Sequence, residues 1–531
     1  MTFFQLFKKP VIIKPLYLIY VFNLIILFGI VFGFLPRQVI LGSAFLIFFY
    51  LFLMKLEDGI LFFLASLPFF VALPVSRGFD SLNIWRIAIL ILFFRFLLAQ
   101  FPFVLLSKPD FFKNLLQKAW SRLKKNKLEL WTLLYFLLAT LSIFVATDKI
   151  VALKRFFYIF QMILIYPLAL HLARDKKLFK KGIKYLFASS FLVFLIGLCQ
   201  LIFAYFTSLG HFWGWWTWHV SLTFYGNNLA NIVARANTWF SYYEGRSPTL
   251  RVFSTFTDSH SFALYLVLAS PLLLWLIAIR FLKSKKIDAV LIFQGIVFLL
   301  MQFSIALSGT RGIWISVGIP LIVATYLVLK NRRNNIFKFA LSSLLIFILA
   351  LLLSSLFLSV PQFNGQDKTD SALTLKRLRS IIDLTETSNQ GRLFIWKESI
   401  KSIAKHPFLG VGIGNFPVIL EQDVLLQKAG STAHNIYLNS AVEMGILGMI
   451  LIIMIFYEIL KKCWAGLKKP QNDSLSILKI FLGFYFLWVF TYCLFDVALF
   501  DARVMMFFVA EVAILFSLTR INSFNNSYKF A

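Results

Sequence analysis

Cysteine is scarce in this sequence of 531 residues, and acidic side chains are far fewer than basic ones. The three cysteines, Cys199, Cys463 and Cys493, lie in or beside apolar runs without Cys-x-x-Cys or metal-ligand spacing. Neither a disulfide framework nor a zinc site is therefore indicated. Asp-x-Asp motifs are absent, and the predicted outer loops contain no pair of carboxylates at a convincing metal spacing. We expect no metal and no other cofactor.

The sequence also lacks Pro-rich, Ser-rich and acidic tracts and any repeat of fixed period, which argues against a separate soluble domain. Hydrophobic residues make up 60% and charged residues 14%, which is more apolar side chain than a soluble core could bury. The net charge of +30 would suggest nucleic acid in a soluble protein. Here the basic residues cluster between apolar runs, where they fix orientation and contact membrane lipids. The composition predicts an all-α polytopic membrane protein that binds no nucleic acid.

Apolar runs long enough to cross a bilayer, or nearly so with tilt, recur along the whole chain. They begin near residues 17, 39, 59, 84, 129, 151, 184, 259, 287, 312, 337, 436, 475 and 503. We expect about 12–14 transmembrane helices, because the runs near 59 and 84 are short and contain prolines or arginines. The lysines ahead of the first run, with no small-residue cleavage site behind it, predict an uncleaved first helix.

Basic residues divide unevenly between the two sides of the predicted membrane. Placing the N-terminus inside puts most of the 53 Lys and Arg residues on the inner side, as the positive-inside rule requires. Two long segments then face away from the cytoplasm. The predicted organisation is N-terminal transmembrane helices at 1–204, an aromatic-rich outer loop at 205–258, central helices carrying Arg311 at 259–360, a large periplasmic or extracellular loop with a basic helix and a Gly-rich turn at 361–435, and C-terminal helices at 436–531.

Basic side chains stand at several outer ends of these runs. The first outer loop contains HFWGWWTWH at 211–219, which fits an interfacial aromatic belt or a platform for a sugar ring or lipid tail. The loop ends at Arg251, which is either a snorkelling side chain or a ligand contact. In ALSGTRGIW, Arg311 lies beside the first turn of a helix, where a guanidinium group can fork onto phosphate oxygens. Lys154 and Arg155 offer a weaker version of this feature, and each of these cations could instead be an interfacial anchor.

The second outer loop is a long polar stretch late in the chain. Residues 391–406 fit a surface helix with Trp396 on its apolar side. Arg392 lies in the first turn of this helix and is a second candidate for binding an anion. The alternative is that Arg392 is only a solvated charge on a basic helix. The glycines of HPFLGVGIGNFP indicate a shaped turn more than a phosphate cradle. His434 and Asn435 then open the next helix.

His434 is the candidate base. A histidine at the start of a helix is more often structural than catalytic, but two arginines are predicted on the same face and no comparable base lies nearby. An unperturbed imidazole has a pKa of about 6.5 and could accept a hydroxyl proton or bind a phosphate. Gly445 and Gly448 fall close to the same helical face, which would let another helix or a lipid chain pass beneath the histidine.

These motifs resemble those of the O-antigen ligase family of lipid-linked glycan transferases. The similar segments are Gly-Arg-x3-Trp at 391–396, Pro-x-x-Gly-x-Gly-x-Gly-Asn-Phe at 407–416 and His-Asn-x9-Gly-x-x-Gly at 434–448, with Ser-Gly-Thr-Arg-Gly at 308–312 and Ser-Thr-Phe-x-Asp-x-His at 254–260 upstream. The resemblance implies a GT-C-like architecture, and it places the family's two essential arginines and histidine at Arg311, Arg392 and His434. The family usually has Asn-Pro-Asn-like residues where this chain has 258–260.

The residues and the resemblance together predict a metal-independent, inverting glycosyltransferase in the bacterial cytoplasmic membrane. It would move a glycan from a polyprenyl diphosphate carrier to a hydroxyl of a glycan or lipid acceptor, such as a lipid A core, at the periplasmic or extracellular face. The candidate catalytic residues are Arg311, Arg392 and His434, and the candidate substrate-binding residues are Arg251, Asn435, Lys154, Arg155 and Trp396. A repeat-unit polymerase and a protein O-oligosaccharyltransferase are alternatives within the same superfamily, and a polysaccharide flippase is the alternative from another class.

Overall fold

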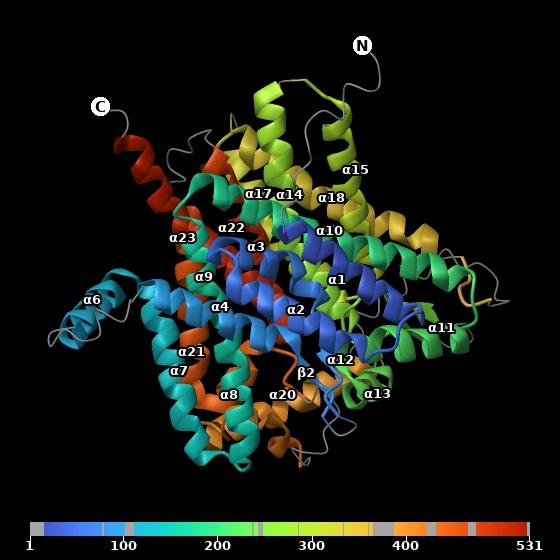
Figure 1. The fold of residues 1–531 in the computed structure, drawn as a ribbon, viewed down its shortest axis with the longest axis horizontal. Coiled ribbons are helices and arrows are strands. Elements are labelled where there is room, and N and C mark those ends of the chain that lie inside the picture. The colour runs from blue at the N-terminus through green and yellow to red at the C-terminus, as the bar shows by residue number, and fades with distance from the viewer. Residues whose placement is uncertain are drawn as a thin grey trace.

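A computed structural model describes residues 15–76, 79–100, 111–235, 238–242, 248–284, 286–332, 334–358, 360–364, 387–421, 432–465 and 474–527. The described part is almost wholly helical, with two short antiparallel pairs of strands, and this confirms the predicted all-α fold (Figure 1). The first elements are α1 (Pro15–Val31), α2 (Val39–Leu53), α3 (Leu56–Ser66), η2 (Leu67–Phe69), β1 (Ala72–Leu73), β2 (Leu82–Asn83), α4 (Ile84–Gln100) and α6 (Phe111–Lys125).

The middle of the chain carries most of the connecting elements. It comprises α7 (Lys127–Val145), α8 (Lys149–Ile163), α9 (Ile165–Leu172), α10 (Lys176–Tyr205), α11 (Leu209–Trp215), η3 (Trp216–Ser221), α12 (Leu222–Tyr225), α13 (Asn227–Arg235), β3 (Phe240–Ser241), β4 (Thr249–Leu250), α14 (Ser259–Ser284) and α15 (Ala289–Leu307). The last part comprises α16 (Arg311–Ser316), α17 (Gly318–Lys330), α18 (Asn335–Leu358), α20 (Thr387–Lys405), η4 (Phe416–Leu420), α21 (Ile436–Trp464), α22 (Ser474–Tyr492), η5 (Ala498–Phe500) and α23 (Ala502–Ser527).

The predicted apolar runs are all helices, and most begin within a few residues of the expected position. The clearest difference is α10, which begins at Lys176 and not near residue 184. Its start is set by Asp175, whose side chain accepts hydrogen bonds from the backbone N–H groups of Lys177 and Leu178. The basic residues at 176–184 are therefore the first turns of this helix and not a connector.

Nine helices within the described ranges are long and apolar enough to cross a membrane. α1 and α2 are apolar but shorter. α3, the weak run near residue 59, has 11 residues and is buried from Gly59 to Ser66. It is therefore a core helix, because its length is well below the roughly 20 residues that a full crossing needs.

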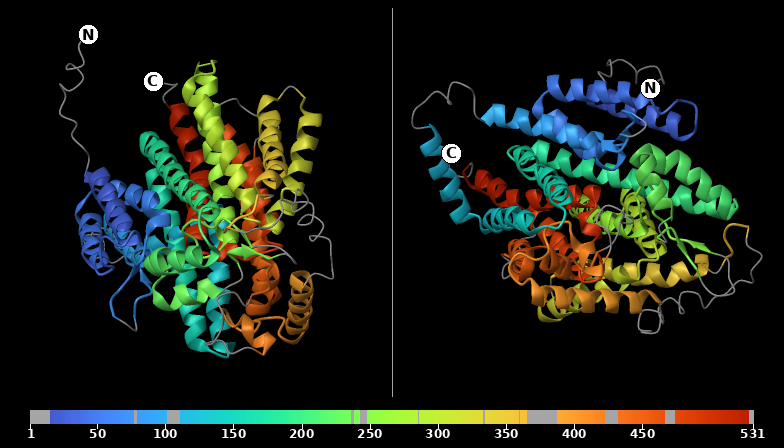
Figure 2. Two further views of the ribbon diagram at one scale, coloured as in Figure 1. Left: turned by 90° about the vertical axis from the view of Figure 1, so that its right-hand side faces the viewer. Right: turned by 90° about the horizontal axis from the view of Figure 1, so that it is seen from below.

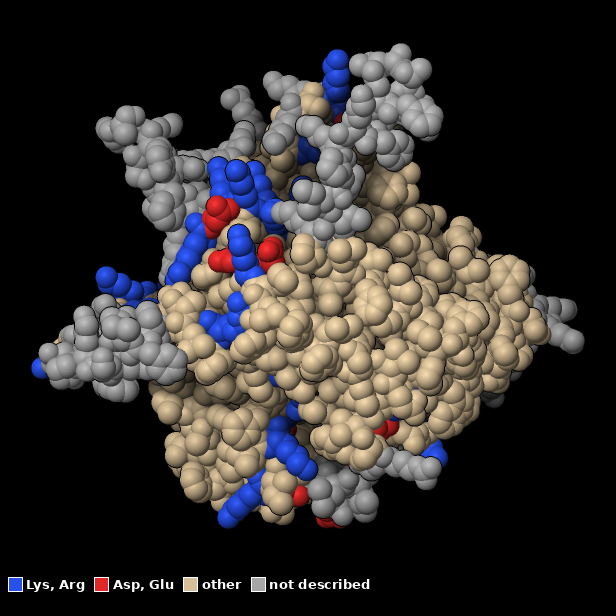
Figure 3. Space-filling model, in the orientation of Figure 1, with Lys and Arg blue, Asp and Glu red and all other residues tan. Residues whose placement is uncertain are grey.

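α14 and α22 occupy the centre of the bundle, and most side chains of α22 are buried. The α14–α15 and α7–α8 hairpins project at opposite ends of the view in Figure 1, as the predicted topology requires of an inner and an outer connection. Figure 3 shows a wide face without charged side chains, with many Lys and Arg residues above it. Which end faces the cytoplasm stays a prediction from the positive-inside rule.

Buried polar contacts hold the segment that precedes α14. Oε1 of Gln200, in α10, accepts the backbone N–H groups of Phe253 and Ser254 at 2.9 Å. Arg503, in the first turn of α23, is 4% exposed and donates to the hydroxyl of Tyr225 and to the carbonyl of Thr255. Because buried donors and acceptors are costly when unpaired, these contacts fix the start of α14 against two other helices.

The Gly-rich turn at 407–415 is inserted into a break in α21. Gly445 has φ 75°, and the break frees backbone groups that bond to the turn: Val411 N–H donates to Val442 O at 2.9 Å, and Ile446 N–H donates to Pro407 O at 2.8 Å. α20 packs beside α21 in the same region (Figure 2). The predicted shaped turn is thus confirmed, but the close neighbour of Gly445 is the turn itself and not another helix or a lipid chain.

Replacing Gly410 with alanine should strongly destabilise the protein. Gly410 has φ 64°, and an added Cβ would lie 2.2 Å from the carbonyl oxygen of Val442, which belongs to rigid backbone. We expect a loss of more than about 2 kcal/mol in unfolding free energy, measured as a lower melting temperature in detergent. Gly295→Ala is the matched control, because a Cβ at Gly295 would meet nothing within 4 Å. Equal melting temperatures for the two variants would contradict the inserted turn.

Candidate active site

A polar cavity of about 430 Å³ lies where several helix ends meet. Its wall is formed by parts of several elements: the first turn of α14, the α15–α16 turn, the start of α20, His434 two residues before α21, and the segment after α22. Four of the sequence-predicted residues line it, namely Arg251, Arg311, Arg392 and His434. These residues are far apart in sequence, so the packing of the helices has brought them to one place.

Two of the arginines meet at the turn between α15 and α16. Arg311 is the first residue of α16 and follows Gly309, whose φ is 64°. Arg251 packs on that glycine, since a Cβ there would lie 3.3 Å from its Cγ and Nε, and Nε donates to Ser308 O at 3.2 Å. The tight turn therefore requires glycine and brings both guanidinium groups to the cavity.

The third arginine comes from α20. Arg392 lines the cavity, but α20 begins at Thr387 and not near residue 391, so Arg392 lies in its second turn and not in the first turn as predicted. One turn further on, Trp396 Nε1 donates to Ala433 O at 2.9 Å. Trp396 does not line the cavity; its hydrogen bond fixes α20 against the residue that precedes His434.

His434 is held in an uncommon backbone conformation. Its φ is 47°, in the left-handed region that few non-glycine residues adopt. Directly after it, the side chain of Asn435 caps α21 by accepting from Tyr437 N–H at 2.9 Å and Leu438 N–H at 3.1 Å. Asn435 is therefore engaged in starting the helix and does not line the cavity, whereas the side chain of His434 does.

Lys154 and Arg155 lie elsewhere. The side chain of Lys154 is exposed, and neither residue is part of the cavity wall. The guanidinium group of Arg155 lies 5.0 Å from the ring centroid of Phe500 and 5.6 Å from that of Tyr158. Its Cβ faces Gly414, so Arg155 supports the Gly-rich turn.

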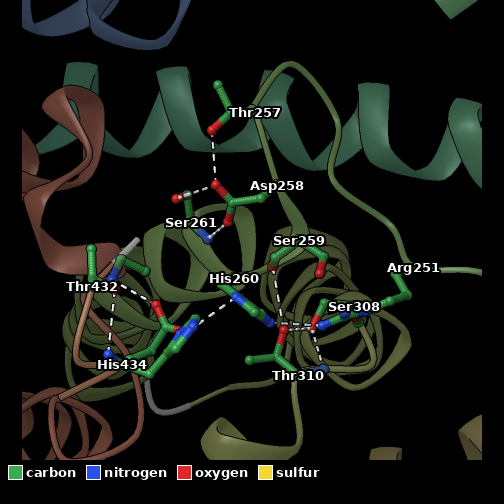
Figure 4. A network of polar contacts seen from close by, with 12 residues as sticks. Arg251, Thr257, Asp258, Ser259, His260, Ser261, Ser308, Thr310, Thr432 and His434 are labelled. Carbon is green, nitrogen blue, oxygen red and sulfur yellow. Dashed lines mark hydrogen bonds and ion pairs between the residues drawn. The ribbon is translucent and has the colours of Figure 1, made fainter. Parts of the chain in front are cut away.

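A second histidine and a carboxylate join the site. His260 Nε2 lies 2.8 Å from Nη2 of Arg251, and His260 Nδ1 lies 3.1 Å from Oδ2 of Asp496. The same oxygen of Asp496 lies 3.8 Å from Nδ1 of His434. Figure 4 shows Arg251, His260 and His434 along one line of polar contacts. Two histidines thus share one carboxylate at the cavity wall.

The charge state of Asp496 follows from these neighbours. Its side chain is 8% exposed, and burial alone would raise the pKa of the carboxyl group. The contacts with His260 and His434 outweigh burial and hold the pKa of Asp496 well below its ordinary value. The carboxylate is therefore ionised at neutral pH and can orient an imidazole or stabilise an imidazolium.

Among the residues that line the cavity and were not sequence candidates, His260, Asp496 and Tyr492 bear on its chemistry. Tyr492 is 1% exposed, and its hydroxyl has no hydrogen-bond partner among the described residues. His260 stood in a noted motif but was given no role, because residues 258–260 depart from the pattern of the family that the chain resembles. Asp258 in that motif caps α14 by accepting from Ser261 N–H at 2.7 Å. A signal for Asp496 was available, since it is an acid in a short connector between two apolar runs.

Comparison with known proteins places this geometry in a family. Residues 296–453 match the model of the family described as O-antigen ligase. These residues are thus similar to the O-antigen ligase family. This confirms the predicted resemblance, and the domain is of the ligase and polymerase type of glycosyltransferase. It contains Arg311, Arg392 and His434, whereas Arg251, His260 and Asp496 lie outside the matched residues.

A relative in another organism matches part of the O-antigen ligase-like chain. An uncharacterized protein of Haemophilus influenzae is 26% identical over 192 residues, which cover 34% of this chain and 45% of that protein. The match thus spans less than half of the relative's length. The activity of the whole chain is therefore a proposal that must be argued from the site.

Proposed function

We propose that this protein transfers a glycan from a polyprenyl diphosphate carrier to an acceptor hydroxyl at the outer face of the bacterial cytoplasmic membrane. The observation that carries the proposal is the cavity in which three guanidinium groups and two histidines surround one carboxylate. A diphosphate leaving group needs such a concentration of fixed positive charge, since negative charge develops on it as the glycosidic bond breaks.

Arg311 and Arg392 are the proposed diphosphate ligands. They reach the cavity from separate elements, α16 and α20, so a diphosphate bound by both would be held from two sides. Guanidinium groups fork onto phosphate oxygens and keep their charge at any physiological pH. Arg251 adds a third charge, and Asn435 and Trp396 support the proposed site by fixing the segment that carries His434.

An apolar cavity beside the site supports a lipid-linked donor. It has a volume of about 340 Å³ and is lined almost entirely by apolar side chains of α7, α8, α21 and α23. Ile436, two residues after His434, is part of its wall. A polyprenyl chain in this cavity would leave its diphosphate near the start of α21, because His434 lines the polar cavity and Ile436, two residues later, lines the apolar one.

His434 is the proposed base. Its Nδ1 faces Asp496, so the other ring nitrogen, Nε2, is the one available to a substrate. In the proposed reaction the acceptor hydroxyl gives its proton to Nε2 while its oxygen attacks the anomeric carbon. The bond from that carbon to the phosphate oxygen breaks, and the diphosphate leaves with the electron pair. A single displacement of this kind inverts the anomeric carbon.

The decisive experiment is reconstitution of the purified protein in liposomes with a lipid-linked glycan and candidate acceptors. A new glycosidic bond, with release of polyprenyl diphosphate, would support the proposal. Movement of the lipid-linked glycan between leaflets without a covalent product would show a flippase instead. The acceptor that becomes labelled, whether lipid A core, growing glycan or protein, distinguishes a ligase from a polymerase and from a protein glycosylator.

Transfer should continue in the presence of excess chelator. The proposed charge stabilisation comes from guanidinium groups, and these would also repel a divalent cation from the cavity. We expect initial rates within about twofold of the untreated rate after addition of EDTA. The measurement is the same transfer assay with and without EDTA, and recovery of a lost rate by added Mg²⁺ or Mn²⁺ would refute the metal-independent mechanism.

A further inference from the structure

His260 lies between two charged groups of opposite sign. Its Nε2 is 2.8 Å from Nη2 of Arg251, and its Nδ1 is 3.1 Å from Oδ2 of Asp496. Figure 4 shows His260 between Arg251 and His434 in this network of polar contacts. The ring belongs to the first turn of α14, and Asp258 caps that turn by accepting Ser261 N–H. The position of the imidazole is thus set by the helix start as well as by its own contacts.

The partners decide which ring nitrogen carries the proton. A guanidinium group can only donate hydrogen bonds, so the nitrogen facing Arg251 must be the acceptor. His260 is therefore neutral with an unprotonated Nε2, and its proton is on Nδ1, facing Asp496. The carboxylate in turn is buried, with 8% of its side chain exposed. Arg251 selects the tautomer, and the tautomer directs an N–H group at the carboxylate.

Asp496 connects this pair to the candidate base. Oδ2 of Asp496 lies 3.8 Å from Nδ1 of His434, and that nitrogen is buried and has no hydrogen-bond partner among the described residues. The side chain of His434 is 34% exposed, so the rest of its ring can reach a substrate in the cavity. Oδ1 of Asp496 accepts the backbone N–H of Ala498 at 2.9 Å, and His260 contacts the other oxygen, Oδ2, so the two contacts together set the direction of the carboxylate.

We propose that His260 is a positioning residue for His434: it holds the Asp496 carboxylate beside Nδ1 of His434, and Arg251 holds His260 in the tautomer that does so. This inference rests on the proposed function, because it assigns His434 the role of base. When Nε2 of His434 accepts the proton of the acceptor hydroxyl, the charge that forms on its ring is stabilised by Asp496. The proton on His260 stays in place, and no proton passes along the chain of contacts.

The tautomer can be tested without any activity assay. In ¹⁵N-histidine-labelled full-length protein in lipid bilayers, solid-state NMR should show His260 protonated at Nδ1 and unprotonated at Nε2 at neutral pH. Assignment would use His260→Gln, which removes the signal. Arg251→Ala removes the donor that faces Nε2, so a larger fraction of His260 should carry a second proton at Nε2 while Nδ1 stays protonated beside Asp496. A wild-type His260 protonated at Nε2 would overturn the proposal, whatever reaction the protein catalyses.

Two substitutions at His260 separate positioning from proton transfer. A glutamine amide can accept from Arg251 and donate to Asp496, but it cannot shuttle a proton at neutral pH. His260→Gln should therefore keep kcat within about threefold of wild type, with an unchanged pH profile. A leucine side chain can neither accept from Arg251 nor donate to Asp496. The kcat of His260→Leu should therefore fall about 10–100-fold, the usual effect of losing a residue that orients a functional group. KM for the lipid-linked donor should change little in both variants.

Matched controls and opposite outcomes complete the test. His406→Gln and His406→Leu alter an exposed histidine at the end of α20 and should leave kcat unchanged.

If His260→Gln is as impaired as His260→Leu at equal melting temperature, His260 transfers a proton and the positioning role is wrong. If His260→Leu is fully active, the network does not support His434. Inactivity of the wild type with every lipid-linked glycan would instead refute the proposed function and leave the tautomer measurement valid.

Discussion

Replacing Arg311 with alanine should lower the rate of glycan transfer by at least about 100-fold, and Arg392→Ala should have an effect of similar size. Both guanidinium groups line the polar cavity, which has one acidic residue, Asp496, among its described lining residues. Removing either group leaves the departing diphosphate with less compensating charge at the moment its negative charge grows. Because this charge develops in the transition state, the loss should fall mainly on kcat and less on KM.

Lysine substitutions sharpen this expectation. A lysine keeps the charge but loses the planar fork, so Arg311→Lys and Arg392→Lys should retain more activity than the alanine variants. Lys401→Ala is the matched control: it removes a cation from α20, but its side chain is 54% exposed and pairs with Glu398 at 2.8 Å. Activity within a few-fold of wild type in folded Arg311→Ala and Arg392→Ala proteins would show that the cavity does not bind the diphosphate.

The parts of the site that could be predicted are those that depend on topology. Arg311, Arg392 and His434 each stand beside the end of an apolar run or of an amphipathic stretch, and the charge distribution assigns all three to one side of the membrane. Helices that alternate across a bilayer bring same-side ends together, so the meeting of these residues followed from counting spans. Trp396 was correctly placed on the apolar side of α20, but its ring bonds to Ala433 O and does not line the cavity, and the packing of α20 against α21 was not predicted.

The parts that could not be predicted depend on how helices rotate about their own axes. Arg155 stands at the expected end of α8, yet its guanidinium group faces Phe500 and the Gly-rich turn. His260 and Asp496 meet because the start of α14 packs against the segment after α22, and their contact at 3.1 Å depends on which side chains face each other. Hydropathy gives no rotation for helices that are apolar on most sides, and α14 and α22 are such helices.

Gly445 shows the same limit in the backbone. The spacing between His434 and Gly445 predicted that both lie on one face of a helix. That prediction assumes a helix without interruption. The helix is instead broken at Gly445, and backbone groups of the 407–415 turn bond to the freed positions. A break of this kind is determined by a partner segment far away in sequence, so no local pattern around residue 445 could have indicated it.

His434→Ala should be the most damaging single substitution, with a loss of transfer of about 10²–10⁴-fold, the usual contribution of a general base. The physical reason is that the acceptor hydroxyl would have to lose its proton to water while its oxygen attacks. Asp496→Asn should lower the rate less, because it removes the carboxylate that orients His434 and stabilises its charged form but leaves the imidazole in place. Both effects should appear in single-turnover rates with saturating lipid-linked donor.

The double variant decides whether the two residues act as a unit. If Asp496 works through His434, adding Asp496→Asn to His434→Ala should cost little beyond His434→Ala alone, since residues of one catalytic unit are strongly non-additive. Independent roles would make the two losses multiply. Full multiplication would thus give Asp496 a role that is independent of His434. A His434→Ala protein that retains near-normal transfer would remove His434 from the role of base and leave it as a structural residue at the start of α21.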